Sequence, residues 1–341
     1  MRHAVFVGTG HVEWREVPDL RLEGDLEALV RPLVVGRCDL DVALVRGLMP
    51  MPPGAPLGHE IIGEVIALGD KVRRVRPGQT VFVPAQISCG VCGNCRRGLT
   101  GRCTSVPFAA SYGMGREGGF GGGLADIVRV PFADAMLTPV PVHADPTKLI
   151  GLADMAADAW RAIAPYLSRH PDARVAVLGG DAQVIGLYAA GLALAMSASI
   201  VRYIDSDAQR LSVAADYGAE IASDYEAESG EYDIVVVANA AVRALVKAFN
   251  LAAPGGNVIS VTPSLTEQPV FDTRVLYHRG VTWTIGRPNC RHGHDGTLSA
   301  WANCGFCPDR VPTLEVPWDD APQAWSGDGL YIAAIRKSDT L

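Results

Sequence analysis

The chain has 341 residues and a formal net charge of −7, with 48% hydrophobic and 20% charged residues. This is the composition of an ordinary globular protein with room for about two domains. The negative charge and the lack of a dense Lys/Arg run exclude a nucleic-acid surface, and no apolar run is long enough to span a membrane.

The first residues, MRHAVFVGTGHVEWREV, read as a β-strand without the long apolar stretch of a signal peptide. We therefore expect a cytoplasmic protein. In that reducing compartment the eight cysteines are expected to be metal ligands or free thiols and not disulfides.

Up to about residue 145 the chain consists of short apolar β-runs interrupted by Gly and Pro. Such runs predict a compact, barrel-like β domain; they are EALVRPLVVG (27–36), EIIGEVIALG (60–69), QTVFVPAQ (79–86) and LADIVRVP (124–131).

From about residue 149 the periodicity changes, and strands alternate with helices. Alternation of this kind predicts a parallel sheet with helices on both faces. Expected strands are 173–180, 199–205, 232–240 and 255–263, and expected helices are 184–196, 207–219 and 241–253. After about residue 287 the alternation is lost, so we predict segments 1–148, 149–286 and 287–341.

Four cysteines share one short stretch in the first segment. Cys89, Cys92, Cys95 and Cys103 follow the spacing C-x2-C-x2-C-x7-C. Four thiolates at this spacing can enclose one tetrahedral Zn²⁺ and leave no position for a substrate. We interpret them as a structural zinc site, so the chemistry must lie elsewhere.

A catalytic zinc keeps one exchangeable position, so its ligands must be residues other than these four cysteines. Cys38 in VVGRCDLD, and His59 and Glu60 in PLGHEIIGEV, stand at the ends of apolar β-runs. From the residues alone, a cysteine of this kind is more often a buried small hydrophobic residue, and such a histidine is more often a satisfied core or surface residue, than a metal ligand.

The segments CDLD, GHE and RPGQTVFV, the four-cysteine loop and the strand–helix half occur in the order typical of one family. The chain resembles the zinc-dependent medium-chain dehydrogenase/reductase family. The resemblance implies an α/β fold with a GroES-like β-barrel catalytic domain and a Rossmann-type, doubly wound cofactor domain.

The resemblance also implies a ligand set. Cys38 and His59 would bind zinc, Glu60 would be a ligand that exchanges with water, and Asp41 would orient the site. Asp154 in GLADMAADAWRAI would be the third fixed ligand, with a helix cap as the alternative.

A strand, a glycine turn and a helix follow in VAVLGGDAQVIGLYAAG, the arrangement that binds a pyrophosphate at a helix N-terminus. The turn departs from G-x-G-x-x-G, and Asp181 within it would repel a diphosphate unless it points away. The residues expected at the cofactor are Gly179, Gly180, Asp181, Val184, Ile185 and Gly186.

Asp205 ends the second strand of this half, 19 residues after Gly186. An acidic residue there accepts hydrogen bonds from the adenosine ribose and repels a 2′-phosphate, so we predict NAD in preference to NADP. Arg202 and Arg210 are nearby cations that can weaken this preference.

The resemblance implies hydride transfer between an alcohol carbon and the nicotinamide, with zinc as the Lewis acid. Many family members carry a Ser or Thr proton relay two residues after the first cysteine ligand, where this chain has Leu40. Asp39 or ordered water could replace it, although Asp39 could equally cap a turn.

We therefore expect two zinc ions per chain and an NAD-dependent dehydrogenase for a secondary alcohol, polyol or sugar-like substrate. An aldehyde or formaldehyde dehydrogenase is one alternative, and a non-catalytic zinc- and nucleotide-binding protein is another. VTWTIG (281–286) resembles the edge strand that pairs subunits in this family, which predicts a homodimer or homotetramer. We assign no metal site to the C-terminal group Cys290, His292, His294, Cys304 and Cys307.

Overall fold

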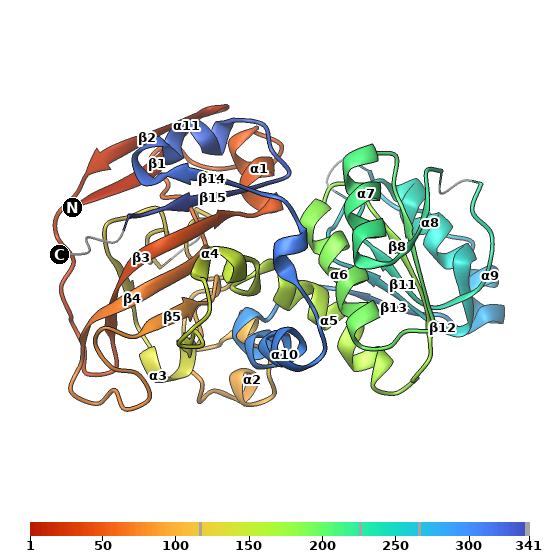
Figure 1. Ribbon diagram of the computed structural model, residues 1–341, viewed down its shortest axis with the longest axis horizontal. Helices are drawn as coiled ribbons and strands as arrows, with labels where there is room; N and C mark the ends of the chain where they lie inside the picture. The colour runs from red at the N-terminus through yellow and green to blue at the C-terminus, as the bar shows by residue number, and fades with distance from the viewer. Residues whose placement is uncertain (116–117, 225–226, 265–266, 338–341) are drawn as a thin grey trace. The chain divides into compact units, whose positions relative to one another are not determined.

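The structure is a computed structural model that describes residues 1–115, 118–224, 227–264 and 267–337 (Figure 1). It divides into two compact units. Unit 1 comprises Met1–Ala157, Asn289–Asp295 and Pro312–Leu341, and unit 2 comprises Asp158–Pro288 and Gly296–Val311. The chain passes from one unit to the other within α5 (Met155–Leu167) and again within α10 (Cys290–Asn303).

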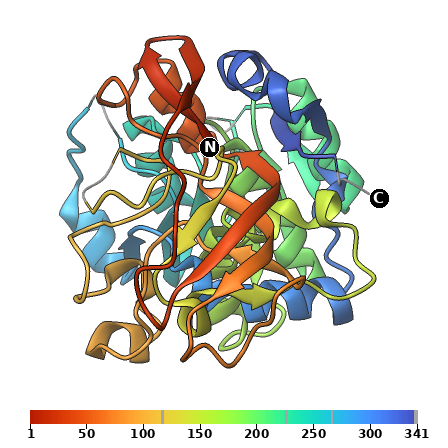
Figure 2. The ribbon, with the colours of Figure 1, turned by 90° about the vertical axis from the view of Figure 1, so that its left-hand side faces the viewer.

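Unit 1 contains a seven-stranded sheet in the order β14-β15-β3-β4-β5-β7, with β6 paired to β3, and a separate β1-β2 hairpin. The strands are β1 (Arg2–Gly8), β2 (His11–Glu16), β3 (Ala28–Arg37), β4 (Glu60–Leu68), β5 (Thr80–Val83), β6 (Val128–Val130), β7 (Thr138–Pro139), β14 (Thr313–Pro317) and β15 (Tyr331–Ile335). All neighbours in the sheet are antiparallel except β14 and β15. Figure 2 turns this unit toward the viewer, with β3 and β4 in red-orange and orange.

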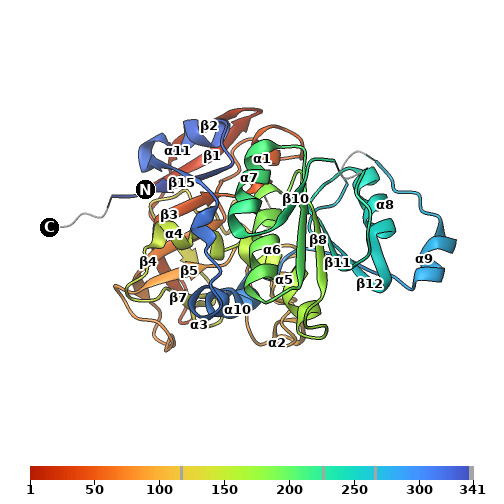
Figure 3. The same cartoon turned by 45° about the vertical axis from the view of Figure 1, so that its right-hand side comes forward.

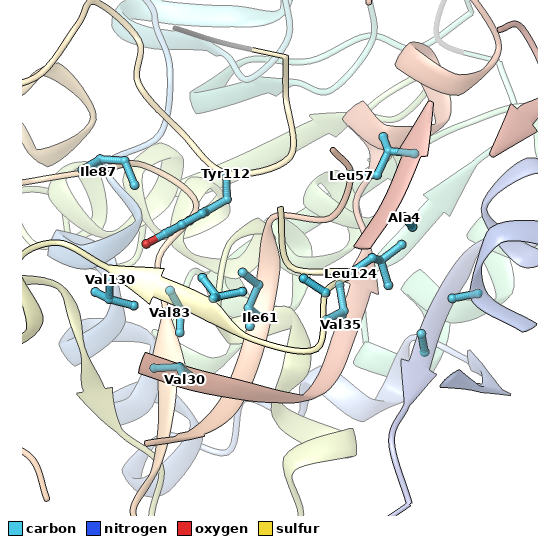
Figure 4. Packing of buried hydrophobic residues seen from close by; sticks show 14 of the residues in the cluster. Ala4, Val30, Val35, Leu57, Ile61, Val83, Ile87, Tyr112, Leu124 and Val130 are labelled. Carbon is cyan, nitrogen blue, oxygen red and sulfur yellow. The ribbon is translucent and has the colours of Figure 1, made fainter. Parts of the chain in front are cut away.

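Among its described residues, unit 1 has short helices in addition to the helix ends that it shares. They are α1 (Asp39–Val45), α2 (Gly93–Arg96), α3 (Ala133–Met136), α4 (Pro146–Leu149), α11 (Ala321–Ser326) and the 3₁₀ turns η1 (Thr100–Arg102), η2 (Ile150–Leu152) and η4 (Trp318–Asp320). The core lies between the strands, where β-branched residues such as Val30, Val35 and Ile61 pack with Leu57 and Leu124 (Figure 4).

Unit 2 is built on a six-stranded parallel sheet in the order β10-β9-β8-β11-β12-β13. The elements are β8 (Arg174–Leu178), α6 (Gln183–Ala195), β9 (Ile200–Ile204), α7 (Ala208–Tyr217), β10 (Glu220–Ala222), β11 (Tyr232–Val237), α8 (Val242–Leu251), β12 (Ala252–Ser260), α9 (Thr273–Arg279), β13 (Thr282–Ile285) and η3 (Pro308–Arg310). In sequence order the strands run 3-2-1-4-5-6, the arrangement of a dinucleotide-binding sheet.

Helices cover both faces of this parallel sheet. α6 contacts β8 and β9, while α8 packs on β11 and β12 from the other face (Figure 3). Because both faces are covered, the central strands are almost wholly apolar, which is why ARVAVLGG and YDIVVVANA were recognisable in the sequence. The expected α/β fold class is confirmed, and β10 is a short strand that the sequence pattern did not indicate.

None of the helices in the described ranges is long and apolar enough to cross a membrane.

We predict that Ile61→Ala lowers the free energy of unfolding of the protein by about 2–5 kcal/mol. Ile61 is fully buried on β4, so the truncation leaves a cavity between packed strands. Urea denaturation followed by circular dichroism measures the change. Ile66→Ala on the same strand is the matched control, because Ile66 is 37% exposed. Equal effects of the two substitutions would contradict the burial argument.

Candidate functional site

Three residues that are far apart in the sequence converge in unit 1. Cys38 lies between β3 and α1, His59 directly precedes β4, and Asp154 lies between η2 and α5. One ligand atom from each lies within 4.8 Å of the others, and all three side chains are buried. His59 Nε2 is 3.6 Å from Asp154 Oδ2. This group contains the three residues that the resemblance implied as fixed zinc ligands.

The pairing of β3 with β4 explains why two of these residues meet. Gly36 is opposite Glu60 in the antiparallel register, so the residues that follow β3 and precede β4 lie at the same end of the pair. Gly58 gives the chain its turn into β4 with a φ of +83°, and a Cβ there would lie 2.9 Å from Leu124 N. Only glycine meets both conditions without strain.

Two further carboxylates border the three residues. Asp41 is fully buried; its Oδ2 accepts the Cys38 N–H at 3.1 Å, and its Oδ1 lies 3.5 Å from His59 Nδ1. Glu60 is also fully buried, and its two oxygens accept hydrogen bonds from the Tyr331 hydroxyl at 2.6 Å and from the Met155 N–H at 3.1 Å. Glu60 therefore lies beside the group without being one of its mutually close members.

The chemistry of this donor set fits a divalent cation. Both ring nitrogens of His59 and Oδ1 of Asp41 are buried without a hydrogen-bond partner among the described residues. Such groups are costly to bury unless something binds them. A thiol, an imidazole and a carboxylate are ligands that zinc accepts, and three protein ligands leave a fourth position open.

The pKa values express the same excess of negative charge. Burial, and then the charge of Asp154, raises the pKa of Cys38 well above its ordinary value. Burial alone would lower the pKa of His59, but Asp41, Asp154 and Glu60 raise it to about 9. The field that favours a proton on the imidazole also favours a metal cation next to it, and a metal would favour the thiolate form of Cys38.

Two residues to which the sequence analysis assigned no role lie next to Asp154. Cys290, the first residue of α10, is fully buried, and its Sγ donates to Asp154 Oδ1 at 2.7 Å. His294, one turn later, is hydrogen bonded through Nε2 to Ala153 O at 2.9 Å and through Nδ1 to Thr138 Oγ1 at 3.1 Å. Their i, i+4 spacing on one helix was the only signal in the sequence.

The other three members of the C-terminal group lie apart from this contact. Cys304 and His292 are exposed, and Cys307 is partly exposed.

The four cysteines of the first segment form a second group in unit 1. Cys89, Cys92, Cys95 and Cys103 each offer a sulfur within 4.8 Å of the others, and Cys92 and Cys103 are 4.0 Å apart at Sγ. Backbone N–H groups point at these sulfurs. Hydrogen bonds, first from the Cys95 N–H and then from Thr104, lower the pKa of Cys92 to about 5. A tetrahedral Zn²⁺ requires such closely placed thiolates, so the group fits a closed metal site.

The predicted cofactor segment lies in unit 2. α6 begins after Ala182, whose side chain provides no cap, so its first backbone N–H groups have the arrangement that binds a phosphate. Asp181 is exposed and accepts the Ala240 N–H at 2.7 Å, which ties it to the loop after β11. A Cβ on Gly180 would lie 2.4 Å from Asn239 Nδ2, which explains the second glycine. Val184, Ile185 and Gly186 are buried in α6.

Asp205 is placed at the end of β9 as expected, but its carboxylate is already engaged. Both oxygens bind Arg210, at 2.7 Å from Nε and 2.7 Å from Nη2. Tyr203 OH and the Asp207 N–H complete four hydrogen bonds, and Asp205 is 2% exposed. A ribose hydroxyl would have to displace one of these donors, and Arg210 compensates the charge that would repel a 2′-phosphate. Arg202 instead pairs with Glu220 and Glu228.

The comparisons with known proteins agree with both halves of the chain. Residues 24–141 match the model of the alcohol dehydrogenase GroES-like domain. A probable zinc-binding alcohol dehydrogenase, Rv1895 of Mycobacterium tuberculosis, is 31% identical over 265 residues, which cover 76% of this chain and 67% of that relative. The structure of the alcohol dehydrogenase TADH from Thermus sp. ATN1 superposes with a TM-score of 0.88 at 29% identity, covering 99% of this chain and 100% of that one.

A third relative is a glutathione-independent formaldehyde dehydrogenase of Pseudomonas aeruginosa. It is 32% identical over 234 residues, and the match covers 65% of this chain and 58% of the length of that relative.

We predict that Cys95→Ser removes one bound zinc ion per chain and lowers the melting temperature, because the closed site loses a thiolate. Elemental analysis of the purified protein and thermal unfolding measure the two effects. Cys304→Ser is the control, since Cys304 is exposed and belongs to neither group. An unchanged zinc content in Cys95→Ser would contradict the assignment of the four-cysteine group.

We predict a pH-dependent contribution of His294 to stability. Burial is the main reason why its pKa is lowered to about 4, and the charge of Arg291 lowers it further. The hydrogen bond with Ala153 and the charge of Asp295 raise the pKa but do not offset the burial. As the pH decreases below the ordinary histidine pKa of about 6.5, His294 is protonated in the unfolded chain before it is protonated in the folded one. The free energy of unfolding therefore decreases as the pH is lowered.

Relative to His294→Gln, the wild type should lose about 2 kcal/mol of this free energy between pH 7 and pH 5. Chemical denaturation at both pH values measures the difference, with exposed His292→Gln as control. Parallel pH dependences of wild type and His294→Gln would contradict the prediction.

Proposed function

Since the chain belongs to the zinc-dependent medium-chain dehydrogenase/reductase family, we propose that it is an alcohol dehydrogenase that transfers a hydride between a small alcohol and NAD. The substrate class is a secondary alcohol, a polyol or a sugar-like molecule, with the corresponding ketone as product. The observation that carries the proposal is the convergence of Cys38, His59 and Asp154, with both ring nitrogens of His59 lacking a hydrogen-bond partner in the part of the chain that the structure describes.

Cys38, His59 and Asp154 would hold a zinc ion, and the residues around them keep them in place. A bound zinc ion would supply a Lewis acid that lowers the pKa of an alcohol, and a bound nicotinamide would accept the hydride. The Asp41 carboxylate accepts the backbone N–H of Cys38 and also faces Nδ1 of His59. It would therefore orient two of the ligands at once.

Glu60 has the role of an exchangeable ligand only if it leaves its present partners. Its carboxylate is held by Tyr331 and by the first N–H of α5, and a Cβ on Gly36 would lie 2.3 Å from its Oε2. We propose that the ground state keeps Glu60 on these donors, which leaves the fourth metal position to water or substrate.

Unit 2 would bind the cofactor. The uncapped start of α6 and the glycine turn at Gly179 and Gly180 support a pyrophosphate position. We propose NAD as the main cofactor. Arg210 pairs with Asp205 and so compensates the charge that would repel the 2′-phosphate of NADP, and NADP is therefore tested beside NAD.

The proton leaving the alcohol needs a path that avoids Leu40, which packs against the apolar core of unit 1. Asp39, the first residue of α1, remains our predicted relay, with ordered water as the alternative.

The identity to a formaldehyde dehydrogenase favours a second candidate function, in which an aldehyde is oxidised with the same metal and cofactor. The protein would act as a homodimer or homotetramer in the cytoplasm. We propose β13 as the pairing edge, because it ends the parallel sheet and exposes Ile285.

The test is a panel of secondary alcohols, polyols and formaldehyde with NAD or NADP, followed by reduced cofactor absorbance and product analysis. Cys38→Ser should lose one of two zinc ions and at least about 100-fold in kcat/KM, since several kcal/mol of charge stabilisation is removed. Cys304→Ser is the control. Full zinc binding and turnover in Cys38→Ser would refute the proposed site, and the absence of turnover in the wild type would favour a non-catalytic binding protein.

A further inference from the structure

We propose that Cys290 is a positioning residue that binds one oxygen of Asp154 and thereby leaves the other oxygen alone to face the metal. The inference rests on the proposed function, because it assigns Asp154 to the zinc. It adds a residue from the last segment of the chain to the support of a ligand set drawn from the first 154 residues.

The two oxygens of Asp154 have different surroundings. Oδ1 accepts a hydrogen bond from Cys290 Sγ at 2.7 Å, and Oδ2 lies 3.6 Å from His59 Nε2. Cys290 is fully buried and Asp154 is 5% exposed, so water does not compete for this contact. The carboxylate oxygen is an acceptor in this contact, so the Cys290 thiol is the donor.

The backbone of Cys290 is fixed from the opposite side. Its N–H donates to Gln86 Oε1 at 3.1 Å, and the preceding Asn289 accepts from Gly101 N at 3.0 Å and from Arg102 Nη1 at 3.2 Å. Gln86 lies three residues before Cys89, and Gly101 and Arg102 lie within the four-cysteine segment. The start of α10 is thus anchored to the four-cysteine segment and to the residues that lead into it.

One turn along α10, His294 fixes the residue before the ligand. Its Nε2 is 2.9 Å from Ala153 O, and burial lowers its pKa to about 4, so the ring is neutral. Cys290 and His294 share a helix face and bind adjacent residues, one through a side-chain oxygen and one through a carbonyl. The carboxylate of Asp154 is therefore restrained in position and in rotation.

Restraint of one oxygen has a chemical consequence. A carboxylate that is free to rotate can bind a metal through both oxygens and fill the position that substrate needs. With Oδ1 committed to a thiol, Asp154 would offer only Oδ2 to a zinc ion held by Cys38, His59 and Asp154, and the fourth position would stay open to substrate.

The test compares Cys290→Ala and Cys290→Val, which remove the donor, with Cys290→Ser, which retains one. The full-length protein is loaded with Co²⁺, and two quantities are measured: cobalt affinity by chelator competition, and the visible ligand-field spectrum, which reports coordination number. Cys38→Ser identifies the bands that belong to this site. Thermal unfolding of each metal-free variant measures the packing cost separately, and exposed Cys304→Ala is the matched control.

We expect cobalt affinity to fall by about 10–100-fold in the Ala and Val variants, with weaker ligand-field bands as the coordination number rises. Cys290→Ser should stay within about threefold of the wild type. If all three variants match the wild type, or if Ser is as impaired as Val, the inference is overturned while the proposed function stands. If the wild type shows no band that Cys38→Ser abolishes, both fail.

Discussion

The burial of negative charge at the end of the β3–β4 pair is the constraint on which unit 1 depends. Asp41 and Glu60 are fully buried, Asp154 nearly so, and Cys38 adds a potential thiolate. An isolated carboxylate in such surroundings would cost many kcal/mol, and a protein usually avoids that cost by protonation or pairing. Here one imidazole faces several anionic groups, and its own nitrogens have no hydrogen-bond partner among the described residues. A divalent cation would offset this negative charge and bind the unpartnered groups at once.

Much of the local architecture serves to hold these carboxyl groups in place. Each carboxylate has its own donor: Cys38 N–H for Asp41, Tyr331 and Met155 for Glu60, and Cys290 for Asp154. These donors come from the residue after β3 and from β15, α5 and α10, so elements distant in sequence are tied to one point. Hydrogen bonds to charged groups are stronger than neutral ones, and the site therefore also contributes to the cohesion of the unit.

The sequence predicted those features whose determinants are local. The four-cysteine spacing lies within 15 residues, and the parallel strands are recognisable because both sheet faces are covered. Cys38 and His59 could be proposed from their places at strand ends, but Asp154 required the family resemblance. Cys290 lies 136 positions from Asp154, and no periodicity reports a contact across that interval.

The nucleotide half shows the same limit in another form. The place of Asp205 at the end of β9 followed from the strand–helix pattern. Its saturation by Arg210 did not, because an arginine on the first turn of a helix is usually solvated and nothing in the sequence fixed its rotamer. A preference for NAD inferred from the acidic residue alone treats that carboxylate as free, whereas its hydrogen-bonding capacity is already used.

The two candidate metal groups differ in how they relate to folding. The four-cysteine group closes loops of a few residues and uses its own backbone N–H groups, so it can form with little of the fold in place. Cys38, His59 and Asp154 span more than a hundred residues and are brought together by the pairing of β3 with β4 and by the segment that leads into α5. Metal binding at the second group is therefore linked to the folding of the whole unit, and any ion bound there stabilises the unit by mass action. The contact between the start of α10 and the four-cysteine segment connects the two, because the loop that forms locally supports the helix that holds the distant ligand.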